Sequence, residues 1–175
     1  MRVVAGDLRG RRLVTPAGAT TRPTSDKVRQ ATFNALESAG DLEGALVLDL
    51  FAGSGALGIE ALSRGAARAT FVERDRGALE ALRANLAALG LADRSTVVVG
   101  DALRHTDGRW DLVLLDPPYA FEGWDELLGR LDAAVVVCES AAAVQAPAGW
   151  RLARVKRYGS TVVTIFRSEI EGHDR

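Results

Sequence analysis

The chain has 175 residues, which suits one domain with a buried core, and its 47% hydrophobic and 26% charged residues are ordinary proportions for a globular protein. Its apolar runs are shorter than the roughly 20 residues that span a bilayer, and residues 1–6 lack a signal-peptide stretch, so we expect a cytoplasmic protein without a membrane partner. The single Cys138 excludes a disulfide framework, and His105 and His173 stand apart from other metal-ligand types, so no metal site is expected.

Positive charge is concentrated near the amino end. Residues 1–30 carry seven basic and two acidic side chains, a net charge of +5, whereas the remaining 145 residues carry 15 basic and 21 acidic side chains, a net charge of −6. A basic end on an acidic body indicates a polyanion partner, although a solvated surface strand has the same composition. The residues predicted to contact the phosphates of such a partner, at the mouth of the active-site pocket, are Arg9, Arg11, Arg12, Arg22, Lys27 and Arg29.

The first elements form a short amino-terminal extension. Residues 1–15 read as two short apolar-basic runs around a turn, which predicts a β-hairpin, and residues 16–24 contain prolines and a glycine, which predicts an irregular segment. A helix is expected over residues 26–38, because Thr24 or Ser25 can cap its first turn.

Strands and helices then alternate along the chain. The expected strands are residues 45–50, 69–72, 95–99, 111–115 and 134–138. The expected helices are residues 56–63, 77–89 and 124–131, and a closing antiparallel pair is expected at residues 151–156 and 161–167. This order predicts an α/β fold with a doubly wound, mostly parallel Rossmann-like sheet, in which residues 1–24 are an arm of the domain formed by residues 25–175.

A glycine motif follows the first of these strands. Gly53, Gly55 and Gly58 form G-x-G-x-x-G between a strand and a helix, a pattern that is also the dinucleotide-binding fingerprint. Glu73 lies 20 residues after Gly53, where a ribose-binding acid is expected. A dinucleotide-dependent oxidoreductase is therefore a serious alternative at this point.

Asp49, just before the glycines, favours a different cofactor. A carboxylate beside the glycine loop would repel the pyrophosphate that such loops cradle. S-adenosylmethionine has no phosphate, and its ammonium and sulfonium charges would be attracted. The simpler alternative is that Asp49 only caps the helix. The predicted cofactor-binding residues are Asp49, Phe51, Ala52, Gly53, Ser54, Gly55, Glu73, Asp101 and Ala102.

Two further acids continue this pattern at the ends of later strands. Glu73 is expected to accept both ribose hydroxyls, whereas Asp75 is expected to cap the next helix. Asp101 follows the third strand and is placed to accept from an adenine amino group. A Gly-Asp pair after a strand is often only a turn, so the prediction for Asp101 depends on its register with Asp49 and Glu73.

The most specific motif is Asp116-Pro117-Pro118-Tyr119, directly after the fourth strand. The prolines fix the backbone and remove two N–H donors, which leaves a carboxylate and carbonyl acceptors. Two acceptors can hold both N–H bonds of an exocyclic base amine and direct its nitrogen toward a methyl group. Tyr119 offers a face on which a flipped base can stack. These four residues are the predicted catalytic residues, and the alternative is a Pro-Pro turn with a capping acid and a core tyrosine.

The motif resembles that of the amino-directed methyltransferases of nucleic-acid bases, and the whole chain is similar to one family among them, the bacterial small-subunit ribosomal RNA guanine-N2 methyltransferases. The stretches that carry this resemblance are residues 6–13, 22–29, 33–34, 49–65, 116–119 and 158–161. One departure is Gln30, where the family pattern has a glutamate. The resemblance implies a class I methyltransferase sheet, S-adenosylmethionine as cofactor, and methylation of one guanine in 16S rRNA, with the 30S subunit or an assembly intermediate as partner.

Several alternatives share some of these features. A DNA adenine-N6 methyltransferase or a protein glutamine methyltransferase would use the same acceptor chemistry, although the short arm leaves little room for a DNA-recognition module. An inert RNA-binding module would not need the catalytic-type side chains. Asp116 could take the proton from the amine, or the proton could be lost to water after transfer. We expect the protein to act as a monomer.

Overall fold

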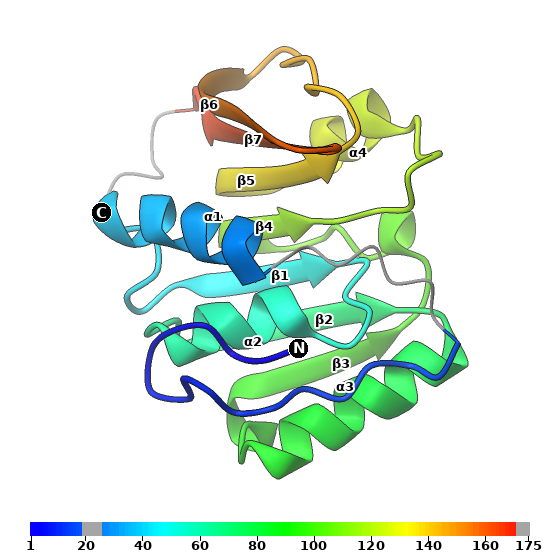
Figure 1. The fold of residues 1–175 in the computed structure, drawn as a ribbon. Helices are drawn as coiled ribbons and strands as arrows, with labels where there is room; N and C mark the ends of the chain where they lie inside the picture. Colours follow the sequence, from blue (N-terminus) through cyan, green and yellow to red (C-terminus); the bar gives the residue numbers. More distant parts are fainter. Residues whose placement is uncertain (19–25, 171–175) are drawn as a thin grey trace.

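The computed structural model describes residues 1–18 and 26–170, and within them a seven-stranded sheet has the order β3-β2-β1-β4-β5-β7-β6 (Figure 1). The strands are β1 (Leu46–Leu50), β2 (Arg68–Glu73), β3 (Ser95–Val99), β4 (Arg109–Leu115), β5 (Asp132–Ser140), β6 (Trp150–Tyr158) and β7 (Thr161–Ser168). Strands β1 to β5 pair in parallel, and β7 pairs antiparallel with both β5 and β6. The predicted doubly wound, mostly parallel α/β fold with a closing antiparallel pair is confirmed.

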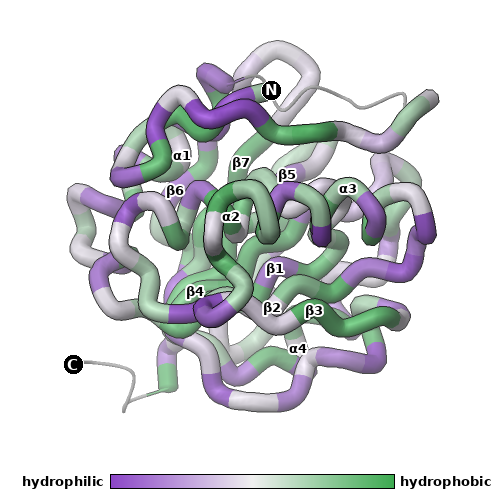
Figure 2. Tube along the Cα trace, turned by 90° about the horizontal axis from the view of Figure 1, so that it is seen from below, coloured by the Kyte–Doolittle hydropathy of each residue, from purple (hydrophilic) through white to green (hydrophobic). Residues whose placement is uncertain are grey.

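Helices cover both faces of this sheet. They are α1 (Asp26–Ser38), α2 (Ala56–Ser63), α3 (Arg76–Ala88) and α4 (Trp124–Arg130), with the short 3-10 helices η1 (Ala92–Arg94) and η2 (Ala102–Arg104). Apolar side chains of α1, α2 and α3 form one core with the sheet, and those of α4 form a second core on the other face. In Figure 2 the hydrophobic colouring accordingly concentrates on the central strands and on α2.

Consecutive strand residues serve these two cores in turn. Val47 of β1 packs in the first core and Leu48 in the second, and Leu112 and Val113 of β4 divide in the same way. This explains why the strands read as continuous apolar runs, since both faces of a parallel sheet are covered. No helix in residues 1–18 and 26–170 is long and apolar enough to cross a membrane.

Most element boundaries agree with the predictions to within two residues. The fifth strand is longer than predicted, because its pairing with β7 extends through Glu139 and Ser140. The predicted cap of α1 by Thr24 or Ser25, and the candidate phosphate ligand Arg22, lie outside the described residues.

The amino-terminal arm packs on α2 and α3. Its predicted hairpin is reduced to one bridge between Arg2 and Arg12, with backbone hydrogen bonds on either side. The N–H groups of Val4 and Ala5 donate to the buried carboxylate of Glu60, at 2.9 and 3.0 Å. These contacts satisfy backbone groups that a regular hairpin would have paired within itself, so the arm is attached to the body along this part of its length.

Candidate active site

An acidic side chain stands at or near the carboxyl end of each of the five parallel strands. Parallel strands bring these ends to one edge of the sheet, which is where doubly wound folds bind their ligands; the arrowheads in Figure 1 mark this edge. The five acids are Asp49 in β1, Glu73 in β2, Asp101 after β3, Asp116 after β4 and Glu139 in β5. The first four were predicted as site residues, and Glu139 was missed.

Asp49 is almost fully buried, with 1% of its surface exposed. Its Oδ2 accepts a hydrogen bond from the N–H of Gly58, at 2.9 Å, in the first turn of α2. Burial raises the pKa of Asp49 well above its usual value, and the hydrogen bond from Gly58 opposes this, while Asp116, Glu73 and Glu139 raise the pKa further. The carboxylate therefore does cap α2, and it also stands in a negative field that would attract a cation.

Glu73 holds the glycine loop in place. Its Oε2 accepts from the N–H of Gly53 at 2.7 Å, and its Oε1 accepts from the N–H groups of Arg74 and Asp75, each at 2.8 Å. A carboxylate has about four lone-pair positions, so about one remains for a ligand hydroxyl. Asp75 accepts from the N–H of Ala78 and caps α3, which confirms the prediction for that residue.

The three glycines of the motif serve different purposes. Gly53 and Gly55 have φ angles of 58° and 87°, in the left-handed region that favours glycine. A Cβ on Gly55 would lie 2.4 Å from Leu82, and one on Gly58 would lie 2.3 Å from Phe71, so these two glycines allow α2 to pack closely. A Cβ on Gly53 would meet no atom within 4 Å. Gly53 is therefore the member of the motif that borders open space.

The remaining predicted cofactor residues are positioned mainly by the fold. Asp101 caps η2, and its side chain is 43% exposed at the carboxyl edge. Ala52 and Ala102 are buried, one in each core. The carbonyl of Ser54 accepts from Nδ2 of the buried Asn85 at 2.9 Å, which ties the glycine loop to α3. Asp101 presents an exposed carboxylate at the edge.

Phe51 connects the glycine loop to the next part of the site. It is the non-glycine residue with a left-handed φ, 61°, among the described residues, and such strain tends to gather at functional sites. Its ring lies 5.4 Å from that of Phe121, which in turn lies 5.1 Å from Trp124, both edge to face. The sequence motifs contained no signal for Phe121 or Trp124, because they bear on the site only through these tertiary contacts.

The Asp116–Tyr119 motif forms the turn that follows β4. Pro117 is buried, whereas Pro118 and Tyr119 are exposed. Tyr119 has 50% of its surface exposed, which excludes the core-tyrosine alternative. Its Oη lies 3.4 Å from Oγ of Ser160, in the turn between β6 and β7. The aromatic face is therefore available to a ligand at the carboxyl edge.

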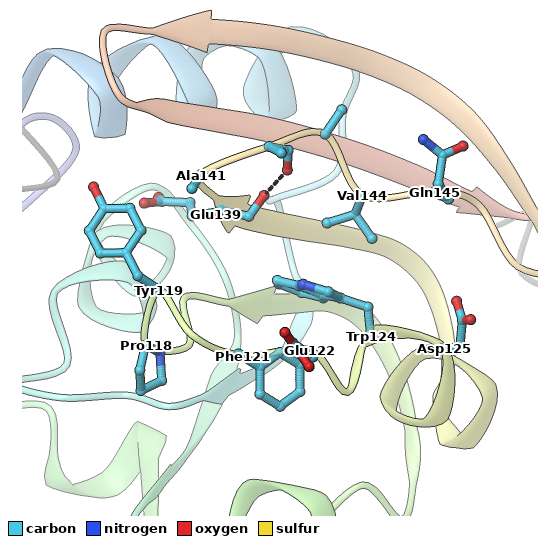
Figure 3. A pocket seen from close by; sticks show the side chains of 13 residues that line it. Pro118, Tyr119, Phe121, Glu122, Trp124, Asp125, Glu139, Ala141, Val144 and Gln145 are labelled. Atoms are coloured by element: carbon cyan, nitrogen blue, oxygen red, sulfur yellow. Dashed lines mark hydrogen bonds between the residues drawn. The ribbon is translucent and has the colours of Figure 1, made fainter.

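A pocket of about 400 Å³ opens beside this turn, within the size range of small-molecule sites. We call it the Tyr119 pocket, and its lining includes Pro118, Tyr119, Phe121, Trp124, Glu139 and Val144. Figure 3 shows Tyr119 and Glu139 at one end of it and Asp125 at the other. The pocket is thus walled by aromatic rings and has a carboxylate near the Asp116–Tyr119 turn.

Glu139 is the main polar group that the sequence analysis missed. It is 2% exposed, lines the Tyr119 pocket and contributes to the raised pKa of Asp49. The strand was expected to end at Cys138, so Glu139 looked like the first residue of a loop. The available signal was an acid at the end of an apolar strand run, the same pattern that pointed to Glu73 and Asp116.

These residues fit a cationic cofactor better than a dinucleotide. A pyrophosphate at the start of α2 would lie near the carboxylates of Asp49 and Glu73, whereas a sulfonium or ammonium group would relieve the repulsion among the acids. With S-adenosylmethionine bound, Asp49 would face the cationic part, Glu73 a ribose hydroxyl and Asp101 the adenine amino group.

The prediction that Arg29 binds phosphate is wrong. Arg29 is 1% exposed and lies 3.4 Å from Oε2 of Glu60 and 2.9 Å from Oδ1 of Asp26. It also donates to the backbone carbonyl of Arg2. Its charge balances the buried Glu60, the acid that binds the arm, so its role lies in the fold.

The arm also lies elsewhere than expected. Nη2 of Arg11 donates to the carbonyl of Ala88, the last residue of α3, and the N–H of Leu8 donates to Oγ of Ser63, the last residue of α2. These helices begin at the carboxyl edge and run back, so their last residues lie at the opposite edge (Figure 1). The expectation that Arg11 and its neighbours line the mouth of the pocket is therefore wrong.

The sheet order, with an antiparallel β7 between β5 and β6, together with the acidic carboxyl edge, defines the class I methyltransferase fold. Within this class, residues 1–167 match the family model described as "conserved hypothetical protein 95", and the chain belongs to that family.

Its relatives include named ribosomal RNA methyltransferases. A Bacillus subtilis (strain 168) protein named "Putative rRNA methyltransferase YlbH" is 38% identical over 183 residues, covering 95% of this chain and 98% of the relative. "Ribosomal RNA small subunit methyltransferase D" of Escherichia coli (strain K12) is 37% identical over 185 residues, covering 98% and 92%. The solved structure "Putative methyltransferase yhhF from Escherichia coli" superposes with a TM-score of 0.85 at 36% identity, covering 98% and 99%. The resemblance to the methyltransferases of small-subunit ribosomal RNA is confirmed.

Proposed function

We propose that this protein transfers a methyl group from S-adenosylmethionine to the exocyclic N2 amine of a guanine in 16S rRNA. Two relatives that match nearly the whole chain are named as ribosomal RNA methyltransferases, one of them of the small subunit, which supports the substrate class. The observation that carries the chemistry is the Asp116–Tyr119 turn, which stands beside Asp49 at the carboxyl edge and opens on the Tyr119 pocket.

The cofactor side of the reaction depends on the acidic edge. S-adenosylmethionine supplies a methyl group that its positively charged sulfur already activates. Asp49 attracts this charge, and Glu73 keeps the glycine loop in shape through Gly53. Both tasks bring the methyl group to a fixed place near the turn after β4, and such positioning is a large part of what an enzyme contributes to a two-substrate transfer.

The acceptor side depends on the turn itself. The lone pair of a guanine amine is delocalised into the ring, so the amine is a poor nucleophile until its N–H bonds are held out of the ring plane. The Asp116 carboxylate and the Pro117 carbonyl are the two acceptors for these N–H bonds, and Tyr119 stacks on the base. Bound S-adenosylmethionine would supply the methyl group to this nitrogen and leave as the neutral thioether, and Asp116 or water would take the proton that the amine loses.

Tritiated methyl transfer tests this proposal. We expect transfer to 30S subunits or to 16S rRNA and not to DNA, with N2-methylguanosine recovered on nucleoside analysis. N6-methyladenosine from DNA, or label in protein, would assign the chain to one of the alternative methyltransferases. Comparing activity on 30S subunits with activity on naked 16S rRNA shows whether the partner is the assembled particle. Light scattering tests whether the protein is a monomer, as expected. Methyl transfer in the presence of a chelator tests whether the reaction is independent of metal, as expected.

Asp116 variants test the acceptor role directly. Asp116→Ala should abolish transfer and leave S-adenosylmethionine affinity nearly unchanged, while Asp116→Asn should keep part of the activity, because an amide oxygen still accepts a hydrogen bond. Asp93→Asn, a change of the same charge in η1 at the opposite edge, is the matched control. Wild-type turnover in Asp116→Ala would overturn this mechanism.

A further inference from the structure

Strand β6 is an edge strand with an unusual surface. It pairs on one side only, with β7, and residues 151–157 are all exposed. The strand carries four cationic side chains and no acidic one; they are Arg151, Arg154, Lys156 and Arg157. None of the four forms an ion pair with another residue in the described part of the chain.

A bulge in β6 aligns three of these charges. Arg151 lies opposite Arg167 of β7, Arg154 opposite Ile165 and Lys156 opposite Val163, and the register shifts between Leu152 and Arg154. The three β7 partners alternate along their strand and so share one face. Without the extra residue of the bulge, Arg151 would point to the other face. The bulge thus produces one cationic row on the face that carries α1.

This row leads to the catalytic turn. Because β6 runs parallel to β5, its last residues reach the carboxyl edge, where the Gly159–Ser160 turn follows. Oγ of Ser160 lies 3.4 Å from Oη of Tyr119. The row from Arg151 to Lys156 lies opposite the four residue steps from Arg167 to Val163 of β7, which cover roughly 13 Å at about 3.3 Å per residue. A polyanion lying along β6 would therefore arrive at the Tyr119 pocket.

We infer that β6 is the surface that holds the RNA phosphate backbone beside the target base, an inference that rests on the proposed function. The carboxyl edge itself bears five carboxylates and repels a polyanion, so a cationic surface next to it is needed to bring RNA close. Of the cations predicted to contact phosphate, Arg11 lies at the opposite edge and Arg29 is buried. Basic residues also keep an edge strand from pairing with another chain, but that purpose does not require a row directed at the pocket.

RNA binding at several salt concentrations tests the inference. The double variant Arg154→Gln, Lys156→Gln should bind 16S rRNA with a flatter dependence of log affinity on log salt, by about 0.7–0.9 per lost phosphate contact and so roughly 1.4–1.8 in total. The KM for RNA in methyl transfer should rise, while S-adenosylmethionine affinity stays at the wild-type value. An unchanged salt slope would overturn the inference.

The arm provides a control of equal charge. Arg9→Gln, Arg12→Gln removes two cations from the opposite edge and should keep the wild-type slope. An equally flattened salt slope in both double variants would show a general charge effect. A flattened salt slope in the arm variant alone would show that RNA binds the arm. Either result overturns the inference. If the β6 double variant is not monodisperse, Lys156→Gln alone should still flatten the slope by roughly 0.7–0.9, and no flattening again counts against it.

The same titrations separate this inference from the proposed function. A wild-type protein that neither binds nor methylates 16S rRNA would refute the proposed function. A wild-type protein that methylates 16S rRNA, beside a β6 variant with the wild-type salt slope and KM, would refute only the assignment of the RNA surface to β6.

Discussion

Replacing Asp49 by asparagine would separate the two tasks of its carboxylate, which are to cap α2 through Gly58 and to attract the positive charge of the cofactor. Asparagine keeps an oxygen that can accept the N–H of Gly58, but it loses the negative charge. Burial first, and then the neighbouring carboxylates, raise the pKa of Asp49 in the folded protein. The stability that such a group contributes is fully present below its pKa in the unfolded chain. It is lost as the pH rises through its pKa in the folded protein. Ionised Asp49 therefore destabilises the ligand-free fold.

Two opposite effects follow from this substitution. Asp49→Asn should raise the Tm of the ligand-free protein at neutral and alkaline pH, and the gain should shrink as the pH falls and wild-type Asp49 becomes protonated. S-adenosylmethionine affinity should fall by one charge-assisted contact, about 1.5–3 kcal/mol, or roughly 10- to 150-fold in Kd. Wild-type affinity should itself weaken on acidification, because protonation removes the same charge.

Thermal melts over a pH series, with calorimetric titration of S-adenosylmethionine, measure both effects. Asp49→Ala is the control, since it removes the cap as well as the charge and should be less stable than Asp49→Asn by about 1 kcal/mol. Unchanged cofactor affinity in Asp49→Asn would mean that the carboxylate only caps α2. A lower Tm than wild type at alkaline pH would refute the reasoning from burial.

Three further predictions concern other parts of the molecule. Glu60→Ala should lower the free energy of unfolding in urea by about 3–5 kcal/mol, because it removes the buried carboxylate shared by Arg29 and Arg64 and leaves them only the exposed Asp26 and Glu37; a loss below about 1 kcal/mol would contradict this. Tyr119→Ala should lower kcat/KM for RNA by the loss of one base stack, about 1–3 kcal/mol, whereas Tyr119→Phe should remain active; equal losses would point to the hydroxyl instead. Burial raises the pKa of the Cys138 thiol, so it should resist alkylation by iodoacetamide until the protein unfolds, and rapid labelling of the folded protein would argue against it.

The local patterns in the sequence were sufficient for the sheet and for four of the five edge acids. Apolar runs followed by acids or glycines predicted where β1, β2 and β4 end, since a strand buried on both faces must be apolar until it reaches the surface. The G-x-G-x-x-G turn likewise depends on glycines close in sequence to Asp49. Because the strands pair in parallel, the acids at their carboxyl ends then meet at one edge of the sheet.

The charged residues were harder to assign. Arg29 and Arg11 have the same side chain in the same basic stretch of residues 1–30, yet one is buried against Glu60 and the other reaches the end of α3. Which cations face solvent depends on what packs over them, and the partner of Arg29 lies 31 residues away, on another helix. Net charge over a window of sequence carries no such information.

The sequence by itself therefore determined the class of fold, the glycine loop and the Asp116–Tyr119 turn, because each is encoded by neighbouring residues whose backbone conformation follows from local sterics and burial. Only the tertiary structure decided that Glu139 and Phe121 line the pocket beside Tyr119, that Arg11 lies away from it, and that β6 reaches it. These arrangements arise where β5, β6 and β7 meet the turn after β4. Long-range pairing and packing, rather than any local pattern, set the register of an edge hairpin against a distant loop.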